Sequence, residues 1–532
     1  MHRCLQSPEL RSLILGQLLR LGWLASLVAL ASCCHELFEP VMALLWRQQR
    51  GLRRLVLLLP GSAFADSDRP NSNNSSLLSL SRRVMPPDLK RLRVYAQFVK
   101  VLDLDDVQVT PDIIAALAAA FGGEALLPAL RRLSWAHADG FGHVLHHLSS
   151  PSLHTLHVVL HDDDLESDVQ ALLSIRRRHS PISNLRLARI PSAEKRELGV
   201  AGLSQALHGW TSLRKICLGD GVANSASLSS IASLPNLREA SFERLLDDHT
   251  FPRSFRALQY LSVGGNSLLP AIHSIKAVES RRIGQLVTSS TAPCHSKEWA
   301  ALFAAIYEHW DPDTPYRLFI SDLPDPCAPS SMPADPLRFS DLRSLIFFNN
   351  ITAINIDKVG GVALTDEDLW RLARSWPCIQ QLHLRGDRTS PPVLRDCTLR
   401  GLAPFTRCQH LVALTIEVDA TGATLPPQPV ADILQRALKT INFGRSPVQS
   451  SLVVAAFLTS IFQGLEHVGI QERLGLDGEE AEAEESRRRV WKKVQRALPL
   501  FSATRASERR RFDAAEPHKS ATLHAKDYLG LE

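Results

Sequence analysis

Six histidines gather in one short stretch of the sequence and are followed at once by three aspartates, residues 162–164. The histidines are His143, His146, His147, His154, His157 and His161. The first and third are four residues apart, a spacing at which two imidazoles on one helix face can bind zinc. His157, however, falls on the outward position between two leucines of an expected strand, and the others fall at ordinary helix or turn positions. We therefore prefer surface histidines to a metal site, and we expect no metal and no cofactor.

The sequence carries none of the short motifs that mark common catalytic or nucleotide sites. It has no GxxxxGK[ST], HExxH, GxSxG or GxGxxG, and the turn-like run Gly264–Ser267 lacks the lysine of a phosphate loop. Its nine cysteines, spread from Cys4 to Cys408, form no CxxC pair, so we expect reduced thiols of an intracellular protein. No arrangement of His and Asp beside a cysteine supports nucleophilic catalysis. The chain is therefore expected not to be an enzyme.

Composition limits the possible classes further. The chain has 532 residues, 60 Lys and Arg against 55 Asp and Glu, and 84 leucines. Its length exceeds the roughly 250–300 residues at which a single core stops growing, so two units or a repeat array are expected. The apolar content of 45% excludes a disordered chain. The near balance of charge argues against a nucleic-acid partner, and the leucine excess favours helices, repeats or both.

The most apolar segment is Leu13–Cys34. A secretion signal or a membrane span needs an uninterrupted apolar centre, which Gln17 and Arg20 interrupt, so neither is preferred and no membrane partner is expected. Apolar residues instead recur at helical spacing from Leu10 to Leu45, with breaks near residue 22 and near residue 34. This pattern predicts three short helices that are too small to form a core alone, which implies a partner surface.

The runs P-E-L-x-x-x-I-x-x-x-L, L-x-x-L-V-A-L-A-S-C-C-H-E-L-F-E-P and L-L-W-R in this segment resemble an F-box, in particular the fungal type that opens a leucine-rich-repeat protein. In that family the box binds a Skp-type adaptor and, through it, a cullin-based ubiquitin ligase. The resemblance implies these adaptor-binding residues: Pro8, Glu9, Ile14, Leu24, Leu27, Leu30, Ala31, Phe38 and Trp46. The alternative is a helical cap that only covers the next domain.

A second pattern, L-x-x-L-x-L with conservative replacements, recurs after a polar tract. It begins at residues 89, 99, 130, 153, 182, 213, 237, 258, 342, 379, 411 and 465. Ile283–Leu286 and Leu318–Ile320 are expected to be degenerate strands of the same array. The helices expected between strands are Ile113–Phe121, Thr365–Ser375, Val430–Ile441 and Gln449–Phe462. Short strands alternating with helices predict a leucine-rich-repeat-like solenoid, with an unrelated leucine-rich helical domain as the alternative.

The predicted fold class is therefore α/β, a small helical F-box-like module followed by an irregular leucine-rich-repeat-like solenoid. The module is placed at residues 1–60, a flexible linker at 61–88 and the solenoid at 89–474. Residues 475–532 are expected to form a solvated, charged helix around Ser486–Leu500 and a disordered tail.

The resemblance implies a substrate-recognition subunit of a cullin-based ubiquitin ligase in the cytoplasm or nucleus, with a Skp-type adaptor, a cullin and an unknown protein substrate as partners. The alternatives are a non-catalytic interaction scaffold and, more weakly, a secreted repeat protein. Because side chains alternate along a strand, residues beside the pattern leucines should face outward and bind the substrate. They include Lys215, Glu239, Tyr260, His383 and Arg385. Tyr260 and Arg385 are the expected anchors, and replacing both by alanine should weaken substrate capture without changing the melting temperature.

Overall fold

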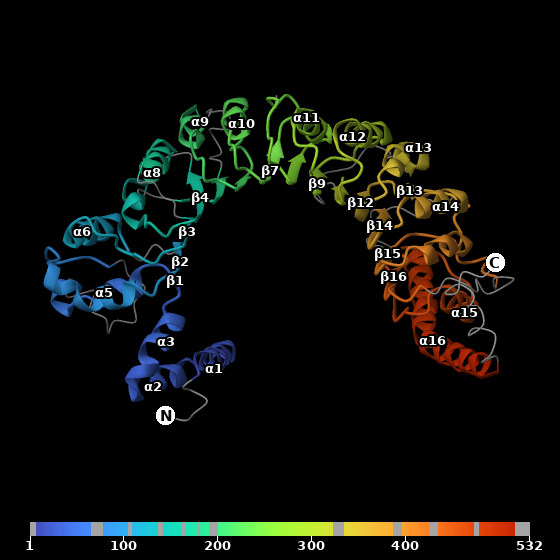
Figure 1. Cartoon of the computed structure of the whole chain (residues 1–532), viewed down its shortest axis with the longest axis horizontal. Coiled ribbons are helices and arrows are strands. Elements are labelled where there is room, and N and C mark those ends of the chain that lie inside the picture. Colours follow the sequence, from blue (N-terminus) through green and yellow to red (C-terminus); the bar gives the residue numbers. More distant parts are fainter. Residues whose placement is uncertain are drawn as a thin grey trace, which may run out of the picture. The chain divides into compact units, whose positions relative to one another are not determined.

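The computed structural model describes residues 7–64, 78–104, 109–136, 142–161, 165–177, 181–190, 201–249, 251–322, 335–386, 396–424, 435–472 and 478–515. It divides into two compact units, residues 1–245 with 249–258, and residues 246–248 with 259–532. Both units are α/β and alternate short parallel strands with helices, as a solenoid-like repeat does (Figure 1). No described helix combines the length and the apolar character that crossing a bilayer requires.

The first unit opens with the three helices that the sequence predicts, α1 (Pro8–Arg20), α2 (Leu24–Cys33) and α3 (His35–Leu45). α1 begins where Ser7 accepts a hydrogen bond from the Leu10 amide, with Pro8 in the first helical position. It ends at Arg20, and the turn that follows contains Gly22, whose φ of 75° suits a glycine. The three helices share a small core, and Phe98 from the following repeat is part of it. The module is thus part of the first unit and packs on the repeat that follows it.

The remaining helices of the first unit are α4 (Arg53–Val56), α5 (Lys90–Ala96), α6 (Pro111–Phe121), α7 (Gly142–Leu145), α8 (Leu165–Arg177), α9 (Ala201–Leu207) and α10 (Ser225–Ala232). Its strands are β1 (Gln48–Arg50), β2 (Val101–Leu104), β3 (Arg132–Trp135), β4 (Thr155–His161), β5 (Asn184–Ile190), β6 (Lys215–Leu218) and β7 (Glu239–Leu245). Each strand pairs in parallel with the next one along the chain. The pattern leucines are buried against α6, α8, α9 and α10, which lie on one side of the strands (Figure 1). The other side is the open face of this sheet.

The helices of the second unit are α11 (Leu269–Ala277), α12 (Ser296–His309), α13 (Phe339–Leu342), α14 (Asp366–Ser375), α15 (Ser451–Ile461) and α16 (Glu479–Ala515), with the 3-10 segments η6 (Arg343–Phe347) and η7 (Leu399–Arg407). Its main parallel strands are β8 (Tyr260–Gly265), β9 (Gln285–Ser290), β10 (Tyr316–Ser321), β12 (Ile351–Lys358), β14 (Gln381–Gly386), β15 (Ala413–Thr415), β16 (Thr440–Asn442) and β17 (His467–Gly469). Strands β11 (Leu337–Arg338) and β13 (Val362–Ala363) form a separate pair. α11, α12 and α14 lie on one side of the main strands and leave an open face on the other (Figure 1).

Most predicted strands are confirmed, including the two degenerate ones, which are β9 and β10. Two predicted strands are wrong. The pattern at residue 89 runs into α5, and the pattern at residue 342 runs into α13 and η6. Leucines three residues apart also lie on one face of a helix, so the spacing does not distinguish a helix from a strand. Leu342 and Leu345 are buried, as the pattern predicts, but they lie on helical segments. The true strand of that repeat, β12, begins several residues later, at Ile351.

One of the helix predictions needs correction as well. The predicted helix Val430–Ile441 ends in strand β16, and residues 425–434 lie outside the described part of the chain. Just before β16, Gln435 is fully buried, and its amide donates hydrogen bonds to the backbone carbonyls of Cys408 and Leu411 at 2.7 and 3.0 Å. The polar side chain therefore ties one repeat to the previous one. By contrast, α6, α14 and α15 confirm the other predicted helices within two residues at either end.

The predicted linker is folded at both ends. Phe64 pairs with Leu80, and Leu78 pairs with Val109, through isolated strand bridges. Phe64 and Leu78, the apolar residues on either side of the polar tract, are also buried. Residues 65–77 of the tract lie outside the described residues.

The charged helix near the end of the chain is longer than predicted and is not simply solvated. One face of α16 is buried, through Trp491, Val494, Ala497 and Leu498. The Trp491 ring stacks on Phe443 at 4.6 Å, and its indole N–H donates to the Ser446 carbonyl at 3.0 Å. The side-chain amide of Gln495 accepts from the Val468 amide at 2.5 Å and donates to the Glu466 carbonyl at 3.0 Å. α16 therefore covers β17, the last strand of the second unit.

Candidate binding surfaces

Large apolar side chains are exposed along α1, the turn after it and the start of α2. This α1–α2 apolar surface consists of Leu10, Leu13, Ile14, Leu21, Trp23, Leu24 and Val28, which are 38% to 64% exposed. Single exposed leucines are common on any protein. A group of this size on two neighbouring helices is instead typical of a surface that contacts another protein.

The predicted adaptor-binding residues differ in their exposure to solvent. Pro8, Glu9, Ile14 and Leu24 are exposed, and Leu30, Phe38 and Trp46 are half-buried. Leu27 and Ala31 are 0% and 6% exposed and belong to the core that the helices share with Phe98. Their side chains hold the module together and do not face a partner. Five exposed members of the α1–α2 apolar surface were not among the predicted residues, because the resemblance alone does not tell which apolar positions turn away from the core: Leu10, Leu13, Leu21, Trp23 and Val28.

The histidine stretch does not assemble into a metal site within the described residues, where no group of three or more His, Cys, Asp or Glu side chains could hold an ion. The rings of His146 and His147 lie against each other at 3.8 Å. His157 stands on the open face of β4, as expected from strand alternation. Burial lowers the pKa of His157, and the cations of Arg132 and Arg186 on the two neighbouring strands lower it further. Residues 162–164 lie outside the described part of the chain.

The thiols of the described residues are unpaired, and none of those cysteines forms a disulfide. Burial raises the pKa of Cys294 and of Cys397 to about 12, and that of Cys408 to about 11. Thiols with such pKa values carry almost no nucleophilic thiolate near neutral pH.

On the open face of the first unit, the two predicted substrate-binding residues form an ion pair. Lys215 on β6 and Glu239 on β7 are register partners, and Lys215 Nζ lies 2.7 Å from a Glu239 carboxylate oxygen. Arg186 and Glu243 form a second pair at 2.8 Å. These charges therefore offset each other, the first pair between the neighbouring strands β6 and β7 and the second between β5 and β7, which lie on either side of β6.

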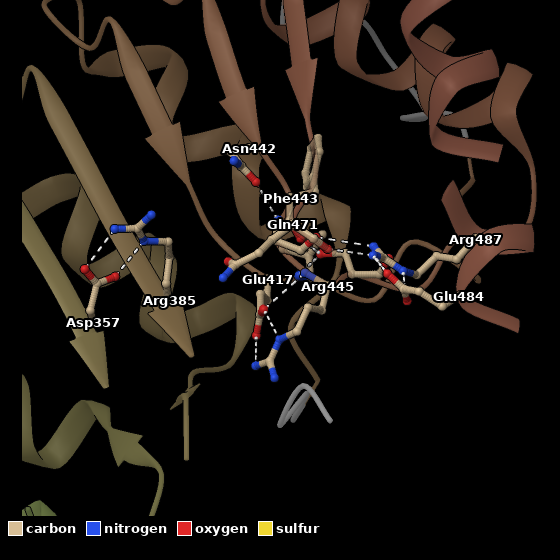
Figure 2. Close-up of polar contacts among 12 residues, drawn as sticks. Asp357, Arg385, Glu417, Asn442, Phe443, Arg445, Gln471, Glu484 and Arg487 are labelled. Atoms are coloured by element: carbon tan, nitrogen blue, oxygen red, sulfur yellow. Dashed lines mark hydrogen bonds and ion pairs between the residues drawn. The ribbon is translucent and has the colours of Figure 1, made fainter. Parts of the chain in front are cut away.

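The other three predicted substrate-binding residues lie on the open face of the second unit. Tyr260 begins β8 and is half-buried. His383 Nδ1 lies 2.6 Å from the Thr415 hydroxyl, and burial lowers the pKa of His383, with a smaller lowering by Arg385. Arg385 makes a two-pronged ion pair with Asp357 on β12, with nitrogen–oxygen distances of 2.6 and 2.8 Å. Arg385 is therefore already engaged within the sheet (Figure 2).

This pairing changes the expectation that Arg385 can be replaced at no cost in stability. We expect Arg385→Ala to lower the free energy of unfolding by about 1 kcal/mol, because it leaves the half-buried Asp357 carboxylate without its cation. Urea unfolding of the full chain measures the loss. Arg343→Ala, at an exposed arginine of η6, is the matched control and should be neutral. Equal stability of the two variants would contradict the role of the pair.

A denser polar cluster follows at the carboxyl end of the second unit (Figure 2). Arg445 is 2% exposed and pairs with Glu417 through contacts of 2.8 and 3.1 Å. The guanidinium occupies the space that a Cβ at Gly386 would need, so a larger residue at that position would displace it from Glu417. Arg487 of α16 donates to the Gln471 carbonyl at 2.8 Å and pairs with Glu484. The cluster fixes the loops after the strands and leaves none of its charges free for a ligand.

The second unit also holds an ion pair that is completely shielded from solvent. Lys358 and Asp322 are both 0% exposed, and Lys358 Nζ lies 3.0 Å from the carboxylate. Lys358 also donates to the carbonyls of Cys294 and Val359 at 2.7 and 2.8 Å. Asp322 accepts from the Val359 and Cys294 amides and from the Trp299 indole. Burial raises the pKa of Asp322, while Lys358 and the amide donors lower it. The pair is a structural element with no access for a substrate.

Comparison with known proteins does not establish a family for this chain. No protein-family model matches the sequence, and no curated protein matches it. Among solved structures, one similar chain comes from the crystal structure of a complex of Rad7 and Elc1 in yeast. The two chains are 12% identical with a TM-score of 0.36, over 72% of this chain and 82% of that chain.

Proposed function

We propose that this chain is the non-catalytic substrate receptor of a cullin-based ubiquitin ligase. In this proposal the α1–α2 apolar surface binds a Skp-type adaptor, and the open faces of the sheets bind a protein substrate. The observation that carries it is the exposed apolar surface on helices that lie where the sequence resembles an F-box. Ile14 and Leu24, two of the residues implied by that resemblance, are part of this surface.

Burial of these side chains against a partner would supply the driving force for docking. Apolar area contributes about 25 cal/mol per Å² on removal from water, so several exposed leucines and a tryptophan are enough for a specific contact. The inner side of the same helices is packed on Phe98, so the surface is presented on a fixed support. A preformed surface loses little conformational entropy on binding.

The chain would act by placement and not by acid–base chemistry. Holding a substrate beside the ubiquitin carrier raises the effective concentration of its lysines, which can accelerate transfer without a catalytic group on the receptor. Such a receptor would work in the cytoplasm or the nucleus, where the ligase components are.

The test is adaptor binding by a single-residue variant of the surface. Leu24 is 53% exposed, so Leu24→Asp should leave the fold intact while placing a charge in the apolar contact. We expect the affinity of the full chain for a purified Skp-type adaptor to fall by about tenfold or more. Calorimetric titration measures the affinity, and circular dichroism confirms that the melting temperature is unchanged.

Two further variants serve as controls for Leu24→Asp, one on the surface and one in the core. Ser26→Asp places the same charge on an exposed position of α2 outside the apolar surface, and it should bind as the original chain does. Leu27→Asp buries the charge in the shared core, so it should unfold the module and is not an interface test. If the original chain binds no adaptor, or if Ser26→Asp and Leu24→Asp weaken binding equally, the ligase proposal fails.

A second candidate is an interaction scaffold in which the three helices only cap the first unit. The shared core with Phe98 favours it, because a cap needs that packing and nothing more. It does not account for the exposed tryptophan and leucines on the outer side. Lack of adaptor binding by a folded chain would leave this candidate standing.

A further inference from the structure

The open face of the second unit carries a patch whose chemistry differs from that of its surroundings. We define the β9–β10–β12 patch as Gln285 and Val287 on β9, Arg317 and Phe319 on β10, and Asn355 on β12. Arg317 is the register partner of Gln285, and Phe319 is the register partner of both Val287 and Asn355. Side chains of register partners on one face lie close together, so the five form one surface.

Arg317 is the charge that the patch leaves uncompensated. The outward charges Asp357 on β12 and Arg385 on β14 are held in a pair (Figure 2). Arg317 is exposed, and within the described residues it makes no ion pair. Its register neighbours on both sides are uncharged. A guanidinium in this position is suited to a carboxylate, which it can bind through two parallel N–H donors.

The same patch offers apolar area next to this cation. Phe319 follows Arg317 by two residues on β10, on the same face, and is half-buried beside Val287. Aromatic and arginine side chains are the residue types that most often carry the binding energy of protein interfaces. The half-buried amide of Gln285 borders the pair and can exchange hydrogen bonds with a peptide backbone.

We propose that the β9–β10–β12 patch binds an extended segment of a partner protein in which an apolar side chain lies two positions from an aspartate or glutamate. The carboxylate pairs with Arg317, and the apolar side chain packs on Phe319 and Val287. In an extended segment such side chains lie on one side at nearly the spacing of Arg317 and Phe319 along β10. The proposal rests on the proposed function, since this partner is the substrate of the receptor.

Selection from a phage-displayed library of random linear peptides on the immobilised full chain tests the proposal. Enriched peptides are expected to share an apolar residue two positions from Asp or Glu. Fluorescence anisotropy with a selected peptide then measures affinity. Arg317→Glu should weaken binding about tenfold or more, and selection on that variant should no longer enrich acidic residues. Phe319→Ala should weaken binding while keeping the acidic preference.

Arg343→Glu makes the same change of charge at an exposed arginine of η6, outside the sheet, and should bind the selected peptide as the original chain does. Failure to enrich acidic peptides, or equal losses in Arg317→Glu and Arg343→Glu, would overturn the assignment. The adaptor titration separates the two proposals. A chain that binds the adaptor but no acidic peptide refutes only the patch, and a chain that binds the peptide but no adaptor refutes only the ligase role.

Discussion

Replacing Lys358 by methionine is expected to lower the free energy of unfolding by about 3–5 kcal/mol, because it leaves a buried carboxylate without its counterion. Lys358 and Asp322 have no solvent exposure, so water cannot take over the role of the missing ammonium group. The change also leaves the carbonyls of Cys294 and Val359 without a donor. Urea unfolding of the full chain, followed by tryptophan fluorescence, measures the loss.

The pH dependence of this loss gives a second readout. Without Lys358, burial is opposed only by the amide and indole donors, so the pKa of Asp322 rises further above its value in the unfolded chain. A carboxyl whose pKa is higher in the folded than in the unfolded state destabilises the fold increasingly as the pH rises from the unfolded-state pKa to the folded-state pKa. Below the unfolded-state pKa this destabilisation is absent. The difference between Lys358→Met and the original chain should therefore shrink as the pH falls toward the unfolded-state pKa of Asp322.

Lys439→Met is the matched control for Lys358→Met. Lys439 pairs with Glu466, but both side chains are about half exposed, so the same substitution should cost no more than about 1 kcal/mol. The double variant Lys358→Met, Asp322→Leu removes both buried charges and should regain part of the stability. If Lys358→Met costs no more than Lys439→Met, the buried pair does not have the role assigned to it.

Trp491→Ala is expected to cost about 3–5 kcal/mol, since it removes a large side chain from a closed core and leaves a cavity. The indole is 2% exposed, stacks on Phe443 and satisfies the Ser446 carbonyl. Loss of the ring should loosen α16 and the strands that it covers. Hydrogen exchange should show faster exchange of the β16 and β17 amides in addition to the lower unfolding free energy.

The neighbouring Lys492 is exposed on the same helix, and Lys492→Ala serves as the control. It should leave both the unfolding free energy and the exchange rates of β16 and β17 unchanged. If α16 were only a solvated helix, as the charge pattern of the sequence suggested, the two alanine variants would behave alike.

The elements that could be predicted from the sequence are those whose signals are local. The capping box at Thr365 and Asp368 fixes the start of α14, and proline at 111 opens α6, so both helices were found. The alternation of leucine with polar residues likewise identified β4, β6 and β14 and placed His157 and Arg385 on the open faces. These inferences need only neighbours along the chain.

What could not be predicted depends on contacts between residues far apart in sequence. Lys358 and Asp322 are 36 residues apart, and nothing near either one indicates that it is buried. The two apolar residues Leu24 and Leu27 look alike in the sequence, although one is exposed and the other is in the core. The alternation rule could have placed Arg317 on the open face, but its proposed role depends on its register partners Gln285 and Ala353, which carry no charge.

The hydrogen bonds between Gln495 and β17 have a consequence for the chain in concentrated solution. A parallel sheet that ends in a bare strand exposes a row of amides and carbonyls that can recruit a strand from another molecule. At β17 the side-chain amide of Gln495 imitates a peptide group and bonds the Val468 amide and the Glu466 carbonyl, the groups a further strand would use. α16 therefore terminates sheet growth at this end and protects the chain from edge-to-edge aggregation.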